Sequence, residues 1–111
     1  MHRASNANEM GWLWLWTWGG TSFGYRDGDD LWTHDGRHVG RFIGNEVYAP
    51  SGAYLGELIG TDRLITSQAK RGWRHAGFTP FAPRTACTAP GALGYATYAG
   101  YEDFPAQGSL R

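Results

Sequence analysis

Cysteine, net charge and long apolar runs are what this sequence lacks. Cys87 is the only cysteine, so no disulfide can form within the chain, and this usage fits a reducing compartment. The ten basic and ten acidic residues balance, which gives the whole chain no strong attraction to nucleic acid or to an anionic membrane. The apolar run Trp12–Trp18 is too short to cross a bilayer, and the polar residues before it do not have a signal-peptide layout. These absences predict a soluble, cytoplasmic protein.

Glycine and aromatic residues, by contrast, are abundant. The 111 residues include 17 glycines and six tryptophans, whereas only 18% of the residues are charged. Glycine supplies the positive φ that tight turns need, and aromatic side chains suit a pleated sheet. The composition therefore favours short strands joined by tight turns, and the length predicts one domain with one modest core.

Glycine and apolar residues recur at intervals of sixteen, which is the signature of an internal repeat. The first glycine series is Gly20, Gly36 and Gly52, and the second is Gly24, Gly40 and Gly56. An apolar residue precedes each glycine of the second series, namely Phe23, Val39 and Leu55. The matching upstream pairs are Leu15-Trp16, Leu31-Trp32 and Val47-Tyr48, and a fourth copy begins at Leu64-Ile65 and then fades.

The repeat predicts an all-β fold, because sixteen residues cannot hold a strand and the crossover helix that parallel strands require. We expect an antiparallel meander of about four hairpins with approximate four-fold pseudo-symmetry. The predicted organisation is a flexible N-terminus at 1–10, a β-hairpin repeat domain at 11–73, and a tail at 74–111. The tail is rich in glycine and proline, so we expect it to consist of loops that pack in part on the domain.

Asp35-Gly36 is a signal for a two-residue hairpin turn, and such a turn fixes a register. It sets Trp32 opposite Val39 and Leu31 opposite Gly40. The same arithmetic gives the pairs Trp16–Phe23, Leu15–Gly24, Tyr48–Leu55 and Val47–Gly56. The second glycine of each repeat would let another side chain or a backbone segment approach closely.

The strand around Trp12–Trp18 is apolar on both faces, with four tryptophans on one side and Leu13 and Leu15 on the other. A meander of hairpins buries one face of each strand, so the second face needs a cover. Two segments could cover the second face, and the sequence does not decide between them. One is the aromatic part of the tail, residues 93–101, packed over Leu13 and Leu15. The other is a second copy of the chain.

Several longer stretches of the sequence are similar to sequences of a known family. The run Leu31–Gly40 (LWTHDGRHVG) and the run Val47–Gly56 (VYAPSGAYLG) resemble the bacterial four-fold β-flower domain. Arg74–Phe81 (RHAGFTPF) and Tyr98–Pro105 (YAGYEDFP) are similar to the tails of members of that family. The resemblance implies a β fold with four-fold pseudo-symmetry. It implies no activity and no catalytic residues.

The chemistry-bearing residues form no recognisable catalytic or metal-binding group. His34 and His38 flank one turn and are expected to be solvent-facing, and Cys87 has no base nearby in the sequence. The acids Asp27, Asp29 and Asp30 crowd one connection, where they either form turns or bind a cation such as Ca²⁺. We therefore expect no catalytic residue, no metal and no cofactor, although an enzyme with an unrecognised site stays an alternative.

Charge is distributed unevenly along the chain. The first 62 residues contain eight acidic and four basic residues, whereas residues 63–84 contain five basic residues and no acid. The candidate binding residues in the basic segment are Lys70, Arg71, Trp73, Arg74 and Phe78. Either they bind single-stranded nucleic acid through phosphate contacts and base stacking, or they pair with the acidic repeats. The function we expect is a non-catalytic protein-binding or scaffold module that binds an unknown protein or self-associates, and nucleic acid is the less favoured partner.

Overall fold

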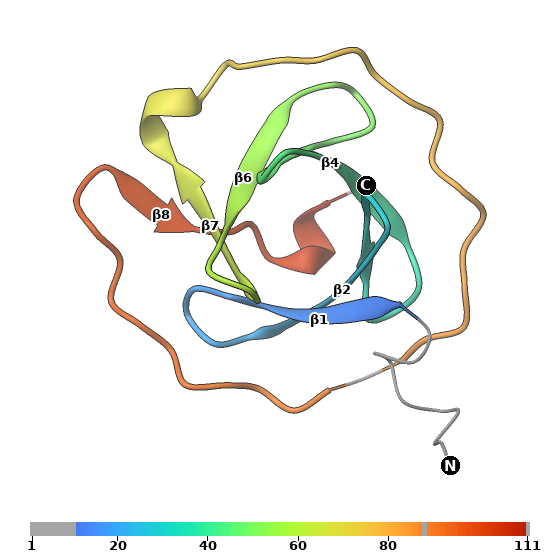
Figure 1. The fold of residues 1–111 in the computed structure, drawn as a ribbon, viewed down its shortest axis with the longest axis horizontal. Helices are drawn as coiled ribbons and strands as arrows, with labels where there is room; N and C mark the ends of the chain where they lie inside the picture. The colour runs from blue at the N-terminus through green and yellow to red at the C-terminus, as the bar shows by residue number, and fades with distance from the viewer. Residues whose placement is uncertain (1–10, 88, 111) are drawn as a thin grey trace.

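The strands follow one another around a closed barrel (Figure 1). The computed structural model describes residues 11–87 and 89–110, so the predicted flexible segment 1–10 lies outside the described residues. The strands are β1 (Trp12–Thr17), β2 (Ser22–Asp27), β3 (Asp30–Thr33), β4 (His38–Ile43), β5 (Glu46–Tyr48), β6 (Tyr54–Ile59), β7 (Arg63–Ser67) and β8 (Tyr101–Asp103). The described residues also form two short 3₁₀ helices, η2 (Gln68–Lys70) and η3 (Gln107–Ser109).

Each strand pairs antiparallel with the next strand of the chain, so the predicted all-β meander is confirmed. The barrel closes where β1 pairs in parallel with β7, at Trp16–Arg63 and Thr17–Leu64. Seven strands form this closed barrel, and β8 is an extra strand beside β7.

The three complete hairpins share one turn geometry. In the second hairpin, Thr33 N–H donates to the Arg37 carbonyl at 2.8 Å and Gly36 N–H donates to the Thr33 carbonyl at 3.0 Å. These bonds enclose a turn of three residues that ends on Gly36 at φ +92°. The equivalent bonds in the other hairpins join Thr17 to Thr21, Gly20 to Thr17, Ala49 to Ala53 and Gly52 to Ala49. A three-residue turn with a positive-φ glycine last is a common hairpin connection.

This turn corrects part of the predicted register. Leu31 does pair with Gly40, but Trp32 pairs with His38 and not with Val39. The three-residue turn shifts the pairing by one residue, and a bulge after Leu31 restores it. The other repeats behave alike: Leu15–Gly24 and Val47–Gly56 are confirmed, whereas Trp16 pairs with Ser22 and Tyr48 with Tyr54, not with Phe23 and Leu55. The extra residues, Phe23, Val39 and Leu55, pack in or against the core.

The core fills the interior of the barrel. Its buried members are Leu15, Phe23, Leu31, Val39, Phe42, Val47, Leu64 and Phe104. The second glycine series makes room for this packing, as predicted. A Cβ on Gly40 would lie 2.8 Å from Val47 Cγ1, and one on Gly56 would lie 2.5 Å from Phe104 Cδ1. Distances this short are not found for real Cβ atoms, so the core as packed requires glycine at these positions.

Strands β7 and β8 occupy the place of a fourth hairpin. Ile65 pairs with Asp103 as Trp32 pairs with His38. Phe104 follows Asp103 as Val39 follows His38, and both are buried in the core. The fourth repeat is therefore completed by residues far along the chain. Residues 68–100 stand where the other hairpins have a turn of three residues.

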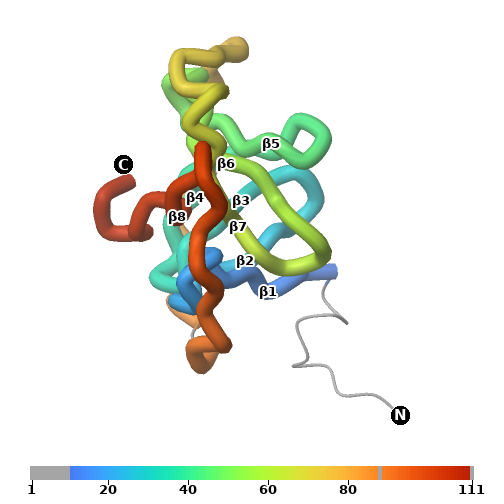
Figure 2. Tube along the Cα trace, turned by 90° about the vertical axis from the view of Figure 1, so that its left-hand side faces the viewer, coloured from blue at the N-terminus to red at the C-terminus, as the bar shows by residue number. Residues whose placement is uncertain are grey.

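Most of this insertion is an extended segment, described at residues 71–87 and 89–100, which we call the strap. In Figure 1 it runs from yellow to orange around the periphery of the barrel, and Figure 2 shows it from the side. At each of the three turns, two backbone N–H groups of the strap, three residues apart, donate hydrogen bonds to the barrel. One accepting carbonyl belongs to the positive-φ glycine of the turn, and the other belongs to the residue two positions before that glycine. The donors and accepting carbonyls are His75 to Gly52, Phe78 to Pro50, Arg84 to Gly36, Cys87 to His34, Ala92 to Gly20 and Tyr95 to Trp18, at 2.7–3.0 Å.

The strap covers the tryptophan face of β1, not the leucine face. Trp16 Nε1 donates to the Pro90 carbonyl at 2.7 Å, and the Trp18 ring lies 5.0 Å from the Tyr95 ring. Leu15 belongs to the barrel core, and Leu13 is 48% exposed. The expected packing of the tail over Leu13 and Leu15 is therefore wrong, because Leu15 is buried inside the barrel and Leu13 stays exposed.

Candidate functional site

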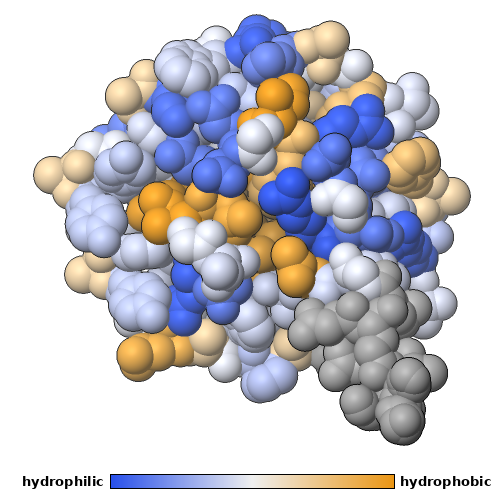
Figure 3. Space-filling view, in the orientation of Figure 1, coloured by the Kyte–Doolittle hydropathy of each residue, from blue (hydrophilic) through white to orange (hydrophobic). Residues whose placement is uncertain are grey.

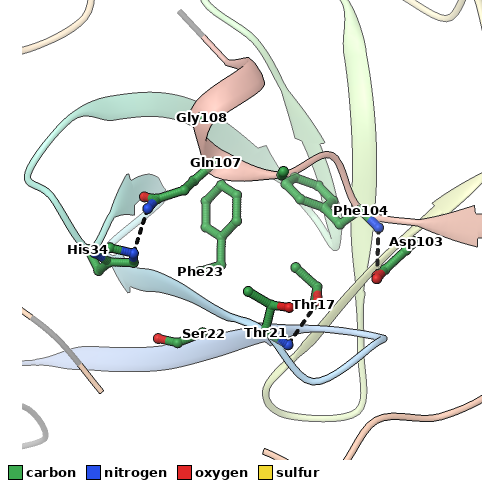
Figure 4. A pocket seen from close by; sticks show the side chains of 10 residues that line it. Thr17, Thr21, Ser22, Phe23, His34, Asp103, Phe104, Gln107 and Gly108 are labelled. Carbon is green, nitrogen blue, oxygen red and sulfur yellow. Dashed lines mark hydrogen bonds between the residues drawn. The ribbon is translucent and has the colours of Figure 1, made fainter. Parts of the chain in front are cut away.

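A cavity of about 180 Å³ lies between the hairpin of β1 and β2, the turn at His34, and the C-terminal segment, residues 103–110 (Figure 4). The residues that line it are Thr17, Thr21, Ser22, Phe23, His34, Asp103, Phe104, Ala106, Gln107 and Gly108. The rings of Phe23 and Phe104 meet edge to face with their centroids 5.2 Å apart. They give the cavity an apolar wall with polar side chains at both ends.

The polar groups of the cavity serve mainly to hold the surrounding backbone. The Asp103 carboxylate accepts the N–H of Gly19 at 3.2 Å and that of Phe104 at 2.9 Å. The His34 ring contacts the Gln107 amide, and Thr17 Oγ1 accepts the Thr21 N–H at 3.2 Å. In the described part of the chain, no hydrogen bond joins a hydroxyl of this cavity to His34. The arrangement can hold a small molecule against two rings, but it does not place a nucleophile on a base.

The C-terminal segment closes one end of the barrel and forms a wall of this cavity. Arg37 donates from Nη1 to the Leu110 carbonyl at 2.6 Å and from Nη2 to the Gln107 carbonyl at 2.9 Å. Leu110 packs against the core. Figure 2 shows this segment at the end of the barrel opposite the turn between β4 and β5.

The basic residues of the predicted binding segment contact other groups of this same chain. Lys70 Nζ lies 2.9 Å from Glu46 Oε2 and 2.8 Å from Glu57 Oε1, and its ammonium lies 5.1 Å from the Trp73 ring centroid. The hydrogen bonds to these two carboxylates raise the pKa of Lys70. The hydrogen bonds that Glu46 accepts from Lys70 and from the Tyr48 hydroxyl lower the pKa of Glu46.

The other candidate residues lie at separate places along the strap. Arg71 pairs with Glu102 of β8 at 2.5 Å, and Arg74 Nη2 donates to the Ser51 carbonyl at 2.9 Å. The Phe78 ring lies 4.2 Å from the guanidinium carbon of Arg41. Of the five predicted binding residues, the structure brings Lys70 and Trp73 together. It does not gather the basic groups on one open surface.

Loss of the Lys70 charge is expected to destabilise the domain by about 1 kcal/mol, because a bridged, partly buried ion pair contributes more than an exposed one. Lys70→Met keeps the apolar stem near Trp73 but leaves Glu46 and Glu57 without their common cation. Urea unfolding at neutral pH measures the change. Arg71→Met is the matched control, with an expected loss below about 0.5 kcal/mol. Equal losses for the two variants would contradict this role of Lys70.

His38 is the residue that the sequence interpretation placed wrongly. We expected a solvent-facing residue beside the turn, whereas its side chain is 0% exposed. It lies on the outer side of β4, and Phe78 and Phe81 of the strap cover it. The aromatic residues of the tail indicated that the tail could bury other side chains, but nothing in the sequence showed that they would pack on His38.

The crowded acids do not converge on one point. Asp27 pairs with Arg84 at 2.9 Å, Asp29 with Arg26 at 3.2 Å, and Asp30 with Arg41 at 3.2 Å. Within residues 11–87 and 89–110, no three His, Cys, Asp or Glu side chains are placed so that they could hold a metal ion.

Comparison of the chain with models of protein families, with curated proteins and with solved structures found no match. Among the described residues, no helix has the length and apolar character needed to cross a membrane.

Proposed function

We propose that this domain is a non-catalytic binding module that recognises a protein partner through exposed apolar side chains of the strap. One observation carries the proposal. Seven large apolar side chains are exposed in the described part of the chain, and five belong to the strap: Trp73, Phe81, Leu93, Tyr95 and Tyr98. The strap is therefore the part of the molecule with the most apolar surface left to bury.

The strap supports binding because its backbone is already fixed. Three pairs of hydrogen bonds hold it on the three turns, so a partner would have to order few additional groups. Tyrosine, tryptophan and phenylalanine are enriched at protein interfaces and dominate their energetics. The stretch 93–98 concentrates three of the exposed residues, and Leu93 is 76% exposed.

The open end of the barrel is the weaker candidate surface. It is seen in Figure 3, where apolar surface near the middle is interrupted by hydrophilic residues. The other two exposed large apolar residues, Leu13 and Ile43, lie on the barrel strands. They supply less apolar side-chain area than the five strap residues.

The alternative functions gain less support from the geometry. Lys70, Arg71 and Arg74 each face an acidic side chain or a carbonyl of this chain, so phosphate binding would have to displace those partners. The cavity beside His34 supports an enzyme less well, because its polar groups hold the backbone. The resemblance to the β-flower family stays a prediction, and it adds no activity.

The test compares two surface variants of the full chain in crosslinking and affinity capture. Leu93→Ser combined with Tyr98→Ser changes the strap, and Leu13→Ser combined with Ile43→Ser is the matched control on the barrel. We expect proteins retained by the wild type to be lost from the strap variant and kept by the control. Similar melting temperatures must first show that both variants are folded. Retention of the same proteins by the strap variant would contradict the proposal.

A further inference from the structure

His38 connects the strap to the barrel in the interval between two anchors. The strap is fastened at Phe78 and again at Arg84. Among the described residues between them, 79–83, one hydrogen bond reaches the barrel, and it runs from the Phe81 N–H to His38 Nδ1 at 2.9 Å. The Phe81 ring stacks on the imidazole at 4.9 Å between centroids and 14° between planes.

This hydrogen bond fixes the protonation state of the ring. A nitrogen that accepts a backbone N–H carries no proton of its own, so Nδ1 of His38 is unprotonated. The single proton of the neutral imidazole is then on Nε2. That atom lies 2.9 Å from Asp30 Oδ1, so the carboxylate faces the protonated edge of the ring.

The surroundings oppose a second proton on this ring. The side chain is fully buried, and Trp32, Phe78 and Phe81 pack around it. Two charged groups face it, namely the Asp30 carboxylate and the Arg41 guanidinium, whose Nε is 3.2 Å from Asp30 Oδ1. Burial lowers the pKa of His38 more than Asp30 raises it, and Arg41 adds to the lowering. Protonation of Nδ1 would also set its N–H against the Phe81 N–H.

We propose that His38 is a pH-operated latch: the neutral ring holds residues 79–83 of the strap on the barrel, and protonation of Nδ1 releases them. Release breaks the hydrogen bond to Phe81 and lifts the ring that covers the imidazole, so that the charged side chain reaches water. The anchors at Phe78 and Arg84 bound the segment that moves. This inference does not depend on which partner the strap binds.

Linkage gives the direction and the size of the effect. A histidine ring exposed to water has a pKa of about 6.5, whereas burial lowers the pKa of the latched ring below this value. Acid therefore favours the released form. Below 6.5, the ratio of released to latched molecules rises by up to about tenfold for each pH unit, until the pKa of the latched ring is reached.

Amide hydrogen exchange of the wild-type protein between pH 7.5 and pH 5 tests the latch. After correction for the intrinsic pH dependence of exchange, we expect the protection of the Phe81 amide to fall severalfold or more. The Ala92 amide is the internal control, because it is bonded to Gly20 and has no histidine acceptor.

A second measurement requires no substitution. The ¹⁵N chemical shifts of the His38 ring at pH 7.5 report which nitrogen holds the proton, and we expect the proton on Nε2. His38→Asn, which keeps an oxygen near the position of Nδ1, should lose the pH dependence of Phe81 protection if it folds. A proton on Nδ1 at neutral pH would overturn the latch. Phe81 protection that changes no more than that of Ala92 would also overturn it.

Discussion

Replacing Gly36 with alanine is expected to lower the free energy of unfolding by about 3 kcal/mol. Two costs combine at this position. Gly36 has φ +92°, a conformation that residues with a side chain adopt only under strain. The added Cβ would also run into the Arg84 carbonyl of the strap, a backbone atom that cannot rotate away. For a domain of this size, the change corresponds to a fall in melting temperature of at least about 12 °C.

Gly44→Ala is the matched control for this prediction. Gly44 also has a positive φ, +63°, but nothing lies within 4 Å of a Cβ added there. Only the conformational cost remains, about 1 kcal/mol. Thermal and urea unfolding of the two variants measure the difference. Equal losses in the free energy of unfolding would mean that the strap backbone does not lie close enough to Gly36 to exclude a side chain there.

Phe104→Ala is expected to cost about 4 kcal/mol, close to the whole stability of a small domain. Phe104 is 3% exposed, packs edge to face on Phe23, and supplies the apolar residue that completes the fourth repeat. Its removal leaves a cavity against Gly56, which has no side chain of its own to fill the space.

The control for this change is Leu93→Ala on the strap. Leu93 is largely exposed, so its truncation should alter the free energy of unfolding by less than about 0.5 kcal/mol. Urea unfolding compares the two variants under one set of conditions. A loss below 1.5 kcal/mol for Phe104→Ala would show that Phe104 is not an integral part of the barrel core.

The spacing of the glycines predicted the hairpins because each glycine satisfies a steric demand that no other residue meets. The register of the aromatic residues was not predictable in the same way. Asp35-Gly36 suits a two-residue turn and also the last two positions of a three-residue turn. The two outcomes differ in the length of the turn and in the bulge at Val39, and neither difference leaves a mark in the residue types.

The course of the strap could not be predicted from the sequence, for a different reason. Backbone hydrogen bonds fasten the strap, and the donors at the three turns are of unrelated types, such as His75, Arg84 and Ala92. Backbone contacts of this kind put no constraint on side chains that a pattern could reveal. The pairing of Lys70 with the acidic repeats was one of two alternatives that the charge distribution left open, and the contacts with Glu46 and Glu57 match that alternative.

The position of the strap inside the fourth hairpin gives folding an order. The three complete hairpins join strands across turns of three residues, and such local structures form within microseconds. Strand β8 reaches β7 only when Ile65 meets Asp103, with the whole strap between them. Closing a longer loop costs more entropy, so this pairing follows the others. Phe104 enters the core at the same step, and the barrel gains its last core residue as the strap closes around it.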